Sequence, residues 1–241
     1  MAASAHVVHF QATKAFFLTG DKRTSRLKGK ENSKGALAFL RFSECYLPER
    51  SFRLRETASG LEKSGVRFWW VVHPPLADSQ TQAGKSSTPN EPCLELLLPE
   101  GFLERTKDRG FLVNSWAPQV EILNHGSVGG FVTHCGWNSF LEALCAGVPM
   151  VAWPLYAEQR MNRIFLVEEM KVALAFREAE DDQFVTAAEL EERVIELVNS
   201  KKGEAIRDRV LKLRKDAVVA KSDGGSSCLA MAKLVDSFKK V

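Results

Sequence analysis

The spacing of hydrophobic positions changes repeatedly along the chain after residue 35. Short apolar runs of strand length alternate with longer stretches in which apolar residues recur every three or four positions. The short runs are apolar at consecutive positions, which is typical of parallel strands covered on both faces. They predict strands at 36–42, 67–72, 111–114, 129–133, 149–153 and 172–176.

The longer stretches predict helices between and after these strands. They cover 51–63, 118–124, 139–146, 158–170, 187–199, 203–220 and 225–239. Thr186 and Glu189 form a capping box at the start of the helix at 187–199. Alternating strands and helices predict an α/β fold, a Rossmann-like parallel sheet flanked by helices, and the last helices form a helical C-terminal tail.

Residues 1–35 differ from the rest of the chain. A short strand-like run at 6–10 is followed by a basic and polar stretch with little hydrophobic content. We predict a first strand plus a disordered basic segment for 1–35, and a single domain for 36–241.

Charge and cysteine content narrow the function classes. The net charge of +3, from 33 basic and 30 acidic residues, is too small to indicate binding to nucleic acid or a membrane surface. The 5 cysteines have no metal-ligand spacing, which favours a reducing compartment. No apolar run approaches the roughly 20 residues of a membrane-spanning helix. The chain is therefore predicted to be cytoplasmic.

Two nucleotide-binding motifs can be set aside. The segment AGKSS at 83–87 resembles the end of a Walker loop, but Ser79 stands where the earlier glycine is required and no strand precedes it. No predicted strand is followed by the G-x-G-x-x-G pattern, which argues against NAD.

The segment THCGWNS at 133–139 joins a predicted strand to a predicted helix. The N–H groups of a helix start, at the carboxyl end of a parallel strand, form a natural site for phosphate. Gly136 allows the backbone close to a ligand, Asn138 and Ser139 add donors, and His134 can donate to a phosphate oxygen. The junction indicates a diphosphate site.

Residues 116–159 read WAPQVEILNHGSVGGFVTHCGWNSFLEALCAGVPMVAWPLYAEQ. This stretch closely resembles the donor-binding signature of the plant UDP-dependent glycosyltransferases, known as the plant secondary product glycosyltransferase box. The resemblance extends over 36–241. It implies the C-terminal, donor-binding half of a two-domain inverting enzyme, with UDP-glucose as co-substrate, no metal and no other cofactor. Residues 1–35 would retain only a remnant of the first half.

By this resemblance, Trp116 stacks on uracil, the Ala117 backbone bonds the base edge, and Gln119 lies near the ribose. The alternative for Trp116 is a core tryptophan at a sheet edge. The full set implied to bind the UDP-sugar is Trp116, Ala117, Gln119, His134, Gly136, Trp137, Asn138, Ser139, Glu142, Tyr156, Glu158 and Gln159, with Trp137 acting mainly through its backbone.

Two pairs within this set have structural alternatives. Ser139 and Glu142 form an S-x-x-E capping box, whereas the resemblance assigns Glu142 to the ribose hydroxyls. Glu158 and Gln159 resemble the pair that binds hexose, with glutamine at the last position typical of glucose. Their alternative is the ordinary polarity of a first helical turn.

The chain departs from the family pattern in its first half. The family's catalytic histidine and acceptor site lie there, so no catalytic residue is assigned in this chain. His6 and His9 fall within the strand-like run and are interpreted as structural. Glu44, in a loop expected to touch phosphate, would repel it.

Two hypotheses from different classes follow. The first is a UDP-glycosyltransferase that transfers a hexose to a hydroxyl of a small acceptor, shortened here and inactive alone. The second is a non-catalytic module or pseudoenzyme that binds a UDP-sugar. The predicted partners are the donor, a small hydroxylated acceptor in a complete enzyme, and a second copy through surface left bare; nucleic acid and membrane are not expected.

Overall fold

The computed structural model describes residues 37–41, 50–72, 97–114, 116–177 and 184–239. Its centre is a 6-stranded sheet in the order β3-β2-β1-β4-β5-β6, and every neighbouring pair is parallel. The strands are β1 Leu37–Arg41, β2 Arg67–Val72, β3 Gly110–Asn114, β4 Val128–Thr133, β5 Met150–Ala152 and β6 Ala173–Ala175. The predicted Rossmann-like parallel sheet is confirmed.

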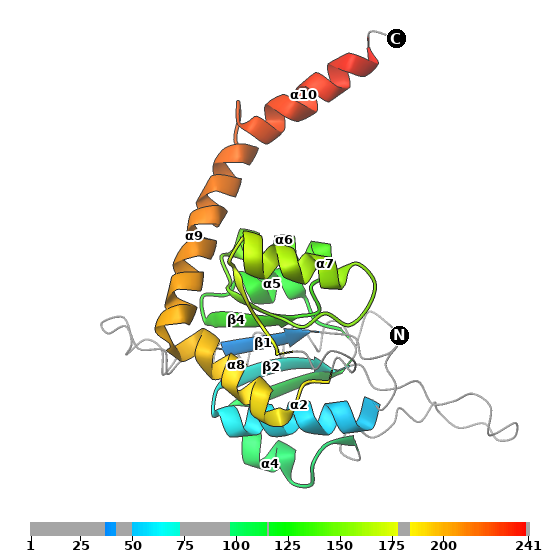
Figure 1. Ribbon diagram of the computed structural model, residues 1–241, viewed down its shortest axis with the longest axis vertical. Helices are drawn as coiled ribbons and strands as arrows, with labels where there is room; N and C mark the ends of the chain where they lie inside the picture. The colour runs from blue at the N-terminus through cyan, green and yellow to red at the C-terminus, as the bar shows by residue number, and fades with distance from the viewer. Residues whose placement is uncertain (1–36, 42–49, 73–96, 115, 178–183, 240–241) are drawn as a thin grey trace, which may run out of the picture.

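Helices cover both faces of this sheet (Figure 1). Helices α5, α6 and α7 lie over one face, and α2, α4 and α8 lie on the opposite side. This three-layer arrangement follows from strands that are apolar on both faces. The helices are α2 Arg50–Ser64, α4 Phe102–Thr106, α5 Gln119–Leu123, α6 Trp137–Ala146, α7 Gln159–Ile164, α8 Ala187–Asn199, α9 Lys201–Lys221 and α10 Ser226–Phe238.

Two helical segments differ from the sequence prediction. The helix predicted at 158–170 is α7 followed by a π-helical segment, η3 Phe165–Glu169. Helix α4 was not predicted, because its 5 residues are too short to show a helical period.

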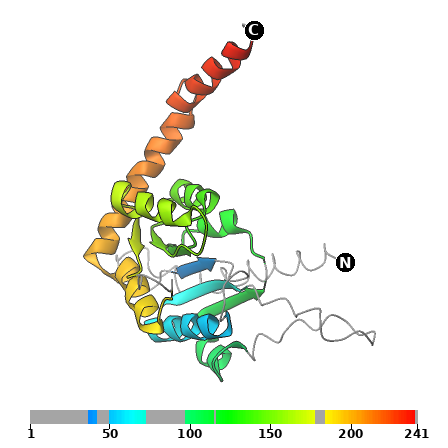
Figure 2. The same ribbon diagram turned by 45° about the vertical axis from the view of Figure 1, so that its right-hand side comes forward.

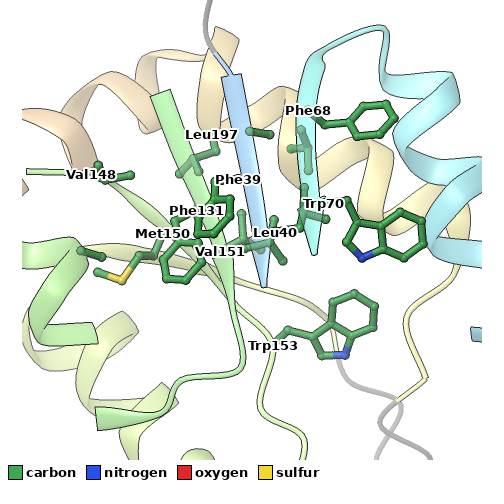
Figure 3. Close-up of a cluster of buried hydrophobic side chains, with 14 of the residues drawn as sticks. Phe39, Leu40, Phe68, Trp70, Phe131, Val148, Met150, Val151, Trp153 and Leu197 are labelled. Carbon is green, nitrogen blue, oxygen red and sulfur yellow. The ribbon is translucent and has the colours of Figure 1, made fainter. Parts of the chain in front are cut away.

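The core lies between the two helical layers and is dense in aromatic side chains (Figure 3). Phe39 of β1 and Phe131 of β4 occupy paired positions of adjacent strands, and their rings stack with centroids 5.1 Å apart. Trp70 of β2 and Trp153, after β5, are buried as well. Burial of each large side chain contributes about 1.5–3 kcal/mol, so the sheet is a rigid base for the loops at its edges.

Helix α8 begins with the predicted capping residue. The Thr186 hydroxyl accepts a hydrogen bond of 3.3 Å from the Glu189 backbone N–H, which confirms one half of the capping box. The other half is not formed, because the Glu189 carboxylate accepts from the Arg177 backbone N–H instead. Glu56 of α2 accepts from the Ala187 backbone N–H at 2.7 Å and ties the two helices together.

Helices α9 and α10 leave the body of the domain, as Figures 1 and 2 show from two directions. The first half of α9 packs through Ile206 and Val210, whereas no residue of α10, all of which are described, is buried. None of the described helices combines the length and apolar character needed to cross a membrane.

Several features named from the sequence lie outside the described residues. They are the segment 1–35 with His6 and His9, the domain boundary at 36, the loop 42–45 with Glu44, and the Walker-like segment 83–87.

Candidate functional site

The strand order places a topological switch point between β1 and β4. From β1 the sheet extends through β2 to β3 in one direction, and from β4 through β5 to β6 in the other. In open parallel sheets of this kind, ligands bind outside the carboxyl ends of the strands at the switch point. The predicted site residues follow β3, β4 and β5, and therefore all lie along this edge.

The turn between β4 and α6 presents the start of a helix at this edge. Cys135 has a φ of 64°, Gly136 is the N-cap of α6, and the helix begins at Trp137. The first N–H groups of a helix have no partner inside the helix, and no side chain of the described residues caps α6. These donors and the helix dipole favour an anion.

His134 lies against Gly136 in this turn. A Cβ atom at position 136 would come within 2.3 Å of the His134 Nε2 atom. The imidazole is half-buried, and it can occupy this place because residue 136 has no side chain. The structure thereby brings together two residues that the sequence assigned to the diphosphate.

The capping-box interpretation of Ser139 and Glu142 is wrong. Because α6 begins at Trp137, Ser139 is the third residue of the helix and not its cap. The predicted helix start at 139 was two residues late. The S-x-x-E pattern here spans the third to the sixth residue of α6, and both of its side chains bond to a different helix.

The hydrogen-bond partner of Ser139 and Glu142 is Gln119, the first residue of α5. Its side-chain Nε2 donates to Ser139 Oγ at 3.0 Å and to Glu142 Oε2 at 2.6 Å. Gln119 is 6% exposed, so one buried amide fixes a hydroxyl and a carboxylate of the neighbouring helix. Glu142 remains partly exposed, and its other oxygen is available for hydroxyl groups such as those of a ribose.

Trp116 stands at the same edge, after β3. Its side chain is 45% exposed, which contradicts the alternative of a core tryptophan. Ala117 is buried. Pro118 is the N-cap of α5, so the helix begins at Gln119, one residue after the predicted start at 118. An exposed indole at this edge is suited to stack on a flat base.

The loop between β5 and α7 carries the last predicted residues. Tyr156 is 44% exposed, Glu158 is exposed at the N-cap of α7, and Ala157 has a φ of 53°. Gln159 is 3% exposed, and its Oε1 accepts from the backbone N–H groups of Leu155 at 2.8 Å and Tyr156 at 3.1 Å. The exposed position of Glu158 therefore fits both hexose binding and the ordinary polarity of a first helical turn. Gln159 is not an ordinary surface residue, because its buried side chain is hydrogen-bonded to the backbone of the loop.

A family model described as UDP-glucoronosyl and UDP-glucosyl transferase matches residues 46–221, more than half of the chain. The chain belongs to this family. The anthocyanidin 5,3-O-glucosyltransferase of Rosa hybrid cultivar is 57% identical over 189 residues, which make up 78% of this chain and 38% of that protein.

Solved structures of plant glycosyltransferases have the same fold. Apo UGT2 of Phytolacca americana matches with a TM-score of 0.76 and 38% identity, over 90% of this chain and 47% of that chain. UGT2 complexed with UDP-2fluoro-glucose and pterostilbene matches with a TM-score of 0.70 and 39% identity, over 85% of this chain and 42% of that chain. This chain spans less than half the length of these relatives.

Two further residues of this UDP-glycosyltransferase domain complete the description. The Trp137 indole is 47% exposed and packs against Phe140 and Phe165, with ring centroids 5.2 and 6.2 Å away. Asn162 of α7, which the sequence prediction missed, is buried and donates to the Cys135 carbonyl at 2.9 Å. The only sequence signal for it is a polar residue among the buried positions of a helix.

Metal ligation was not expected from the sequence. Among the described residues, no group of three or more His, Cys, Asp or Glu side chains is arranged to hold a metal ion.

Proposed function

We propose that this domain binds a UDP-sugar at the carboxyl edge of its sheet, with the diphosphate at the start of α6. The observation that carries the proposal is the pair of hydrogen bonds from Gln119 to Ser139 and Glu142. These bonds hold Ser139 and Glu142 of α6 in place, which supports a role for the Glu142 carboxylate at the ribose, near open N–H groups that suit a diphosphate. The donor analogue in the name of the UGT2 complex supports the same ligand class.

The remaining roles follow the geometry and the resemblance. Trp116 stacks on uracil and the Ala117 backbone bonds the base edge. His134 donates to the phosphate from which the sugar departs, and Gly136, Asn138 and Ser139 hold the diphosphate, with the Trp137 backbone toward the sugar. Glucose is the proposed sugar, bound by Tyr156, Glu158 and Gln159. The name of the rose relative, a glucosyltransferase, supports this choice.

The proposed reaction of the complete enzyme is hexose transfer to a small hydroxylated acceptor. The acceptor oxygen attacks the anomeric carbon, the bond to the β-phosphate oxygen breaks with inversion, and the acceptor proton passes to a base. Anthocyanidin and pterostilbene, in the names of the relative and the complex, support a phenolic acceptor.

The second candidate function is donor binding without transfer by this chain alone. It is favoured because the chain spans 38% of the rose relative and no residue of this chain is assigned as the catalytic base. Loss of a positioned base lowers a rate by about 10²- to 10⁴-fold, and loss of an acceptor pocket removes orientation as well. We therefore expect binding of UDP, weaker than by a complete relative, without glucosylation of phenols.

Calorimetric titration with UDP tests the site, with Glu142→Ala and Glu121→Ala as matched variants. Glu121 is an exposed glutamate of α5, outside the assigned set. Glu142→Ala is expected to lower UDP affinity by about tenfold because a hydrogen-bonded charge is lost, whereas Glu121→Ala leaves it unchanged. Absence of UDP binding by the unaltered chain overturns the proposed function.

A product assay with UDP-glucose and a phenolic acceptor separates the two candidates. Turnover by the chain alone overturns donor binding without transfer. Binding without turnover supports it.

Two smaller proposals concern the surroundings of the chain. We propose a cytosolic location, supported by Cys145 and Cys228, which are free thiols. We also propose that the exposed apolar face of α10, formed by Met231, Leu234, Val235 and Phe238, associates with a second copy of the chain, because no residue of this helix is buried.

A further inference from the structure

Cys135 is held in a conformation that its side chain disfavours. A φ of 64° lies in the left-handed region, where a residue with a Cβ atom is uncommon and costs free energy. Such a residue persists only where its neighbours determine the backbone. The turn that leads into α6 therefore depends on contacts outside itself.

Two buried side chains supply those contacts. Thr133 Oγ1 accepts from the Cys135 backbone N–H at 3.3 Å, and Asn162 Nδ2 donates to the Cys135 carbonyl oxygen at 2.9 Å. Thr133 is 0% exposed and Asn162 is 5% exposed. The Cys135 backbone is thus bonded on both sides of its Cα atom, once from β4 and once from α7.

The bond to the carbonyl sets the direction of the next N–H group. A peptide unit is planar and trans, so its C=O and N–H point in opposite directions. The Cys135 carbonyl and the Gly136 N–H belong to one such unit. Because the Cys135 carbonyl points toward Asn162 of α7, the Gly136 N–H points away from α7. This N–H is the first of the open donors at the start of α6.

Helix α7 holds the neighbouring loop as well. Gln159 accepts from the backbone of Leu155 and Tyr156, and Asn162 lies three residues further along the same side of the helix. One short helix therefore connects the loop assigned to the sugar with the turn assigned to the diphosphate.

We propose that Asn162, with Thr133, is a positioning residue for the diphosphate: it orients the Cys135–Gly136 peptide so that the start of α6 faces the phosphates. The proposal rests on the proposed function, because it assumes that UDP occupies this edge. It adds a residue outside 116–159 that acts on the ligand only through the backbone.

The test compares UDP with uridine, which has the same base and ribose but no phosphate. Both are titrated by ligand-detected NMR into the full chain and into Asn162→Leu, which has similar volume but no donor. We expect about a tenfold loss of UDP affinity and unchanged uridine affinity. A purely structural role would lower the melting temperature and leave the ratio of the two affinities as it was, which overturns the proposal.

Thr106→Val is the matched control. The Thr106 hydroxyl is buried and donates to the Phe102 carbonyl at 2.8 Å in α4, on the far side of the sheet from α7 (Figure 1). The Thr106→Val variant loses a buried side-chain hydrogen bond to a backbone carbonyl, as Asn162→Leu does. We therefore expect a lower melting temperature and an unchanged ratio of UDP affinity to uridine affinity. An equal change of that ratio in Thr106→Val overturns the proposal.

If Asn162→Leu does not fold, the variants Thr133→Val and Thr133→Ser test the same proposal. Valine keeps the shape of threonine and removes the acceptor for the Cys135 N–H, whereas serine retains it. Loss of UDP affinity in the valine variant and its return in the serine variant support the proposal; equal UDP affinity in both overturns it. If the unaltered chain binds uridine and UDP equally, the proposed diphosphate site itself is wrong.

Discussion

Gly136 illustrates how one missing side chain shapes the candidate site. The His134 imidazole occupies the space that a Cβ atom at position 136 would fill, with Nε2 only 2.3 Å from that point. Residue 136 has a φ of −63°, which any residue can adopt. The need for glycine at this position is therefore one of space and not of backbone conformation.

Gly136→Ala is accordingly expected to displace the imidazole without unfolding the domain. UDP affinity should fall by about tenfold, because a donor to a charged phosphate is moved away. Calorimetric titration with UDP measures the change, and a thermal melt verifies the fold. Gly126→Ala is the control, since a Cβ atom there meets no atom within 4 Å. Unchanged UDP affinity in Gly136→Ala would contradict this role of His134.

At the scale of elements, α2 connects the helices on its side of the sheet. Its Glu62 carboxylate accepts from Arg105 of α4 at 2.5 and 3.1 Å, and Arg109, before β3, donates to the last carbonyls of α2 at Leu61 and Glu62. Gly60 allows α8 to approach, because a Cβ atom there would lie 2.7 Å from the Ala187 carbonyl oxygen.

The Glu62–Arg105 pair predicts a pH-dependent contribution to stability. The hydrogen bond from Arg105 holds the pKa of the Glu62 carboxyl below its ordinary value. A lowered carboxyl pKa stabilises the fold above the ordinary pKa, and this stability is lost as pH falls through the lowered value.

Glu62→Gln should therefore lower the free energy of unfolding at about pH 7, with a difference from the unaltered chain that is lost at acidic pH, as the pH falls through the lowered pKa. Urea unfolding across this range measures it. Glu104→Gln is the control, since the Glu104–Lys107 pair lies within the segment of α4 and does not join it to α2. A difference that grows as pH falls would contradict the assignment.

Gly60→Ala should weaken the packing of α2 against α8. The added methyl group also meets the Leu190 Cβ atom at 2.9 Å, so the helices must separate, at a cost of about 1–3 kcal/mol in the free energy of unfolding. Chemical denaturation of Gly60→Ala and of the neighbouring Ser59→Ala compares the two positions. Equal stability of the two variants would show that α8 moves away without cost.

At the scale of the whole molecule, α10 is the exception to a well-packed domain. It projects from the body in both views (Figures 1 and 2), and four of its large apolar side chains share one face. These are Met231, Leu234, Val235 and Phe238, from 45% to 71% exposed.

This face predicts concentration-dependent self-association. Sedimentation velocity over a range of protein concentrations should show dimers or larger species, because the face loses contact with water on association. Leu234→Ser together with Phe238→Ser should shift the chain toward monomer, whereas Lys233→Ser should not. A clean monomer at every concentration would contradict the proposed association.

The strands and most helices were predictable because their signals are local. All six predicted strands are present, each within two residues of its predicted bounds, since continuous apolar runs of this length are typical of a strand covered on both faces. Helix α4 was missed because five residues show no period. The prediction of a capping box at Ser139 was wrong because the S-x-x-E pattern occurs both at helix starts and inside helices, and the sequence alone does not distinguish the two.

What the sequence by itself determined is the class of the fold, the family, and the edge of the sheet where we propose that the ligand binds, because these depend on periodicity and on motifs contiguous along the chain. Only the tertiary structure decided what the polar side chains bond to: Gln119 reaches Ser139 and Glu142 from another helix, and Asn162 reaches Cys135 across 27 positions. A side-chain hydrogen bond needs donor and acceptor within about 3 Å, and the folded backbone alone brings such distant residues together.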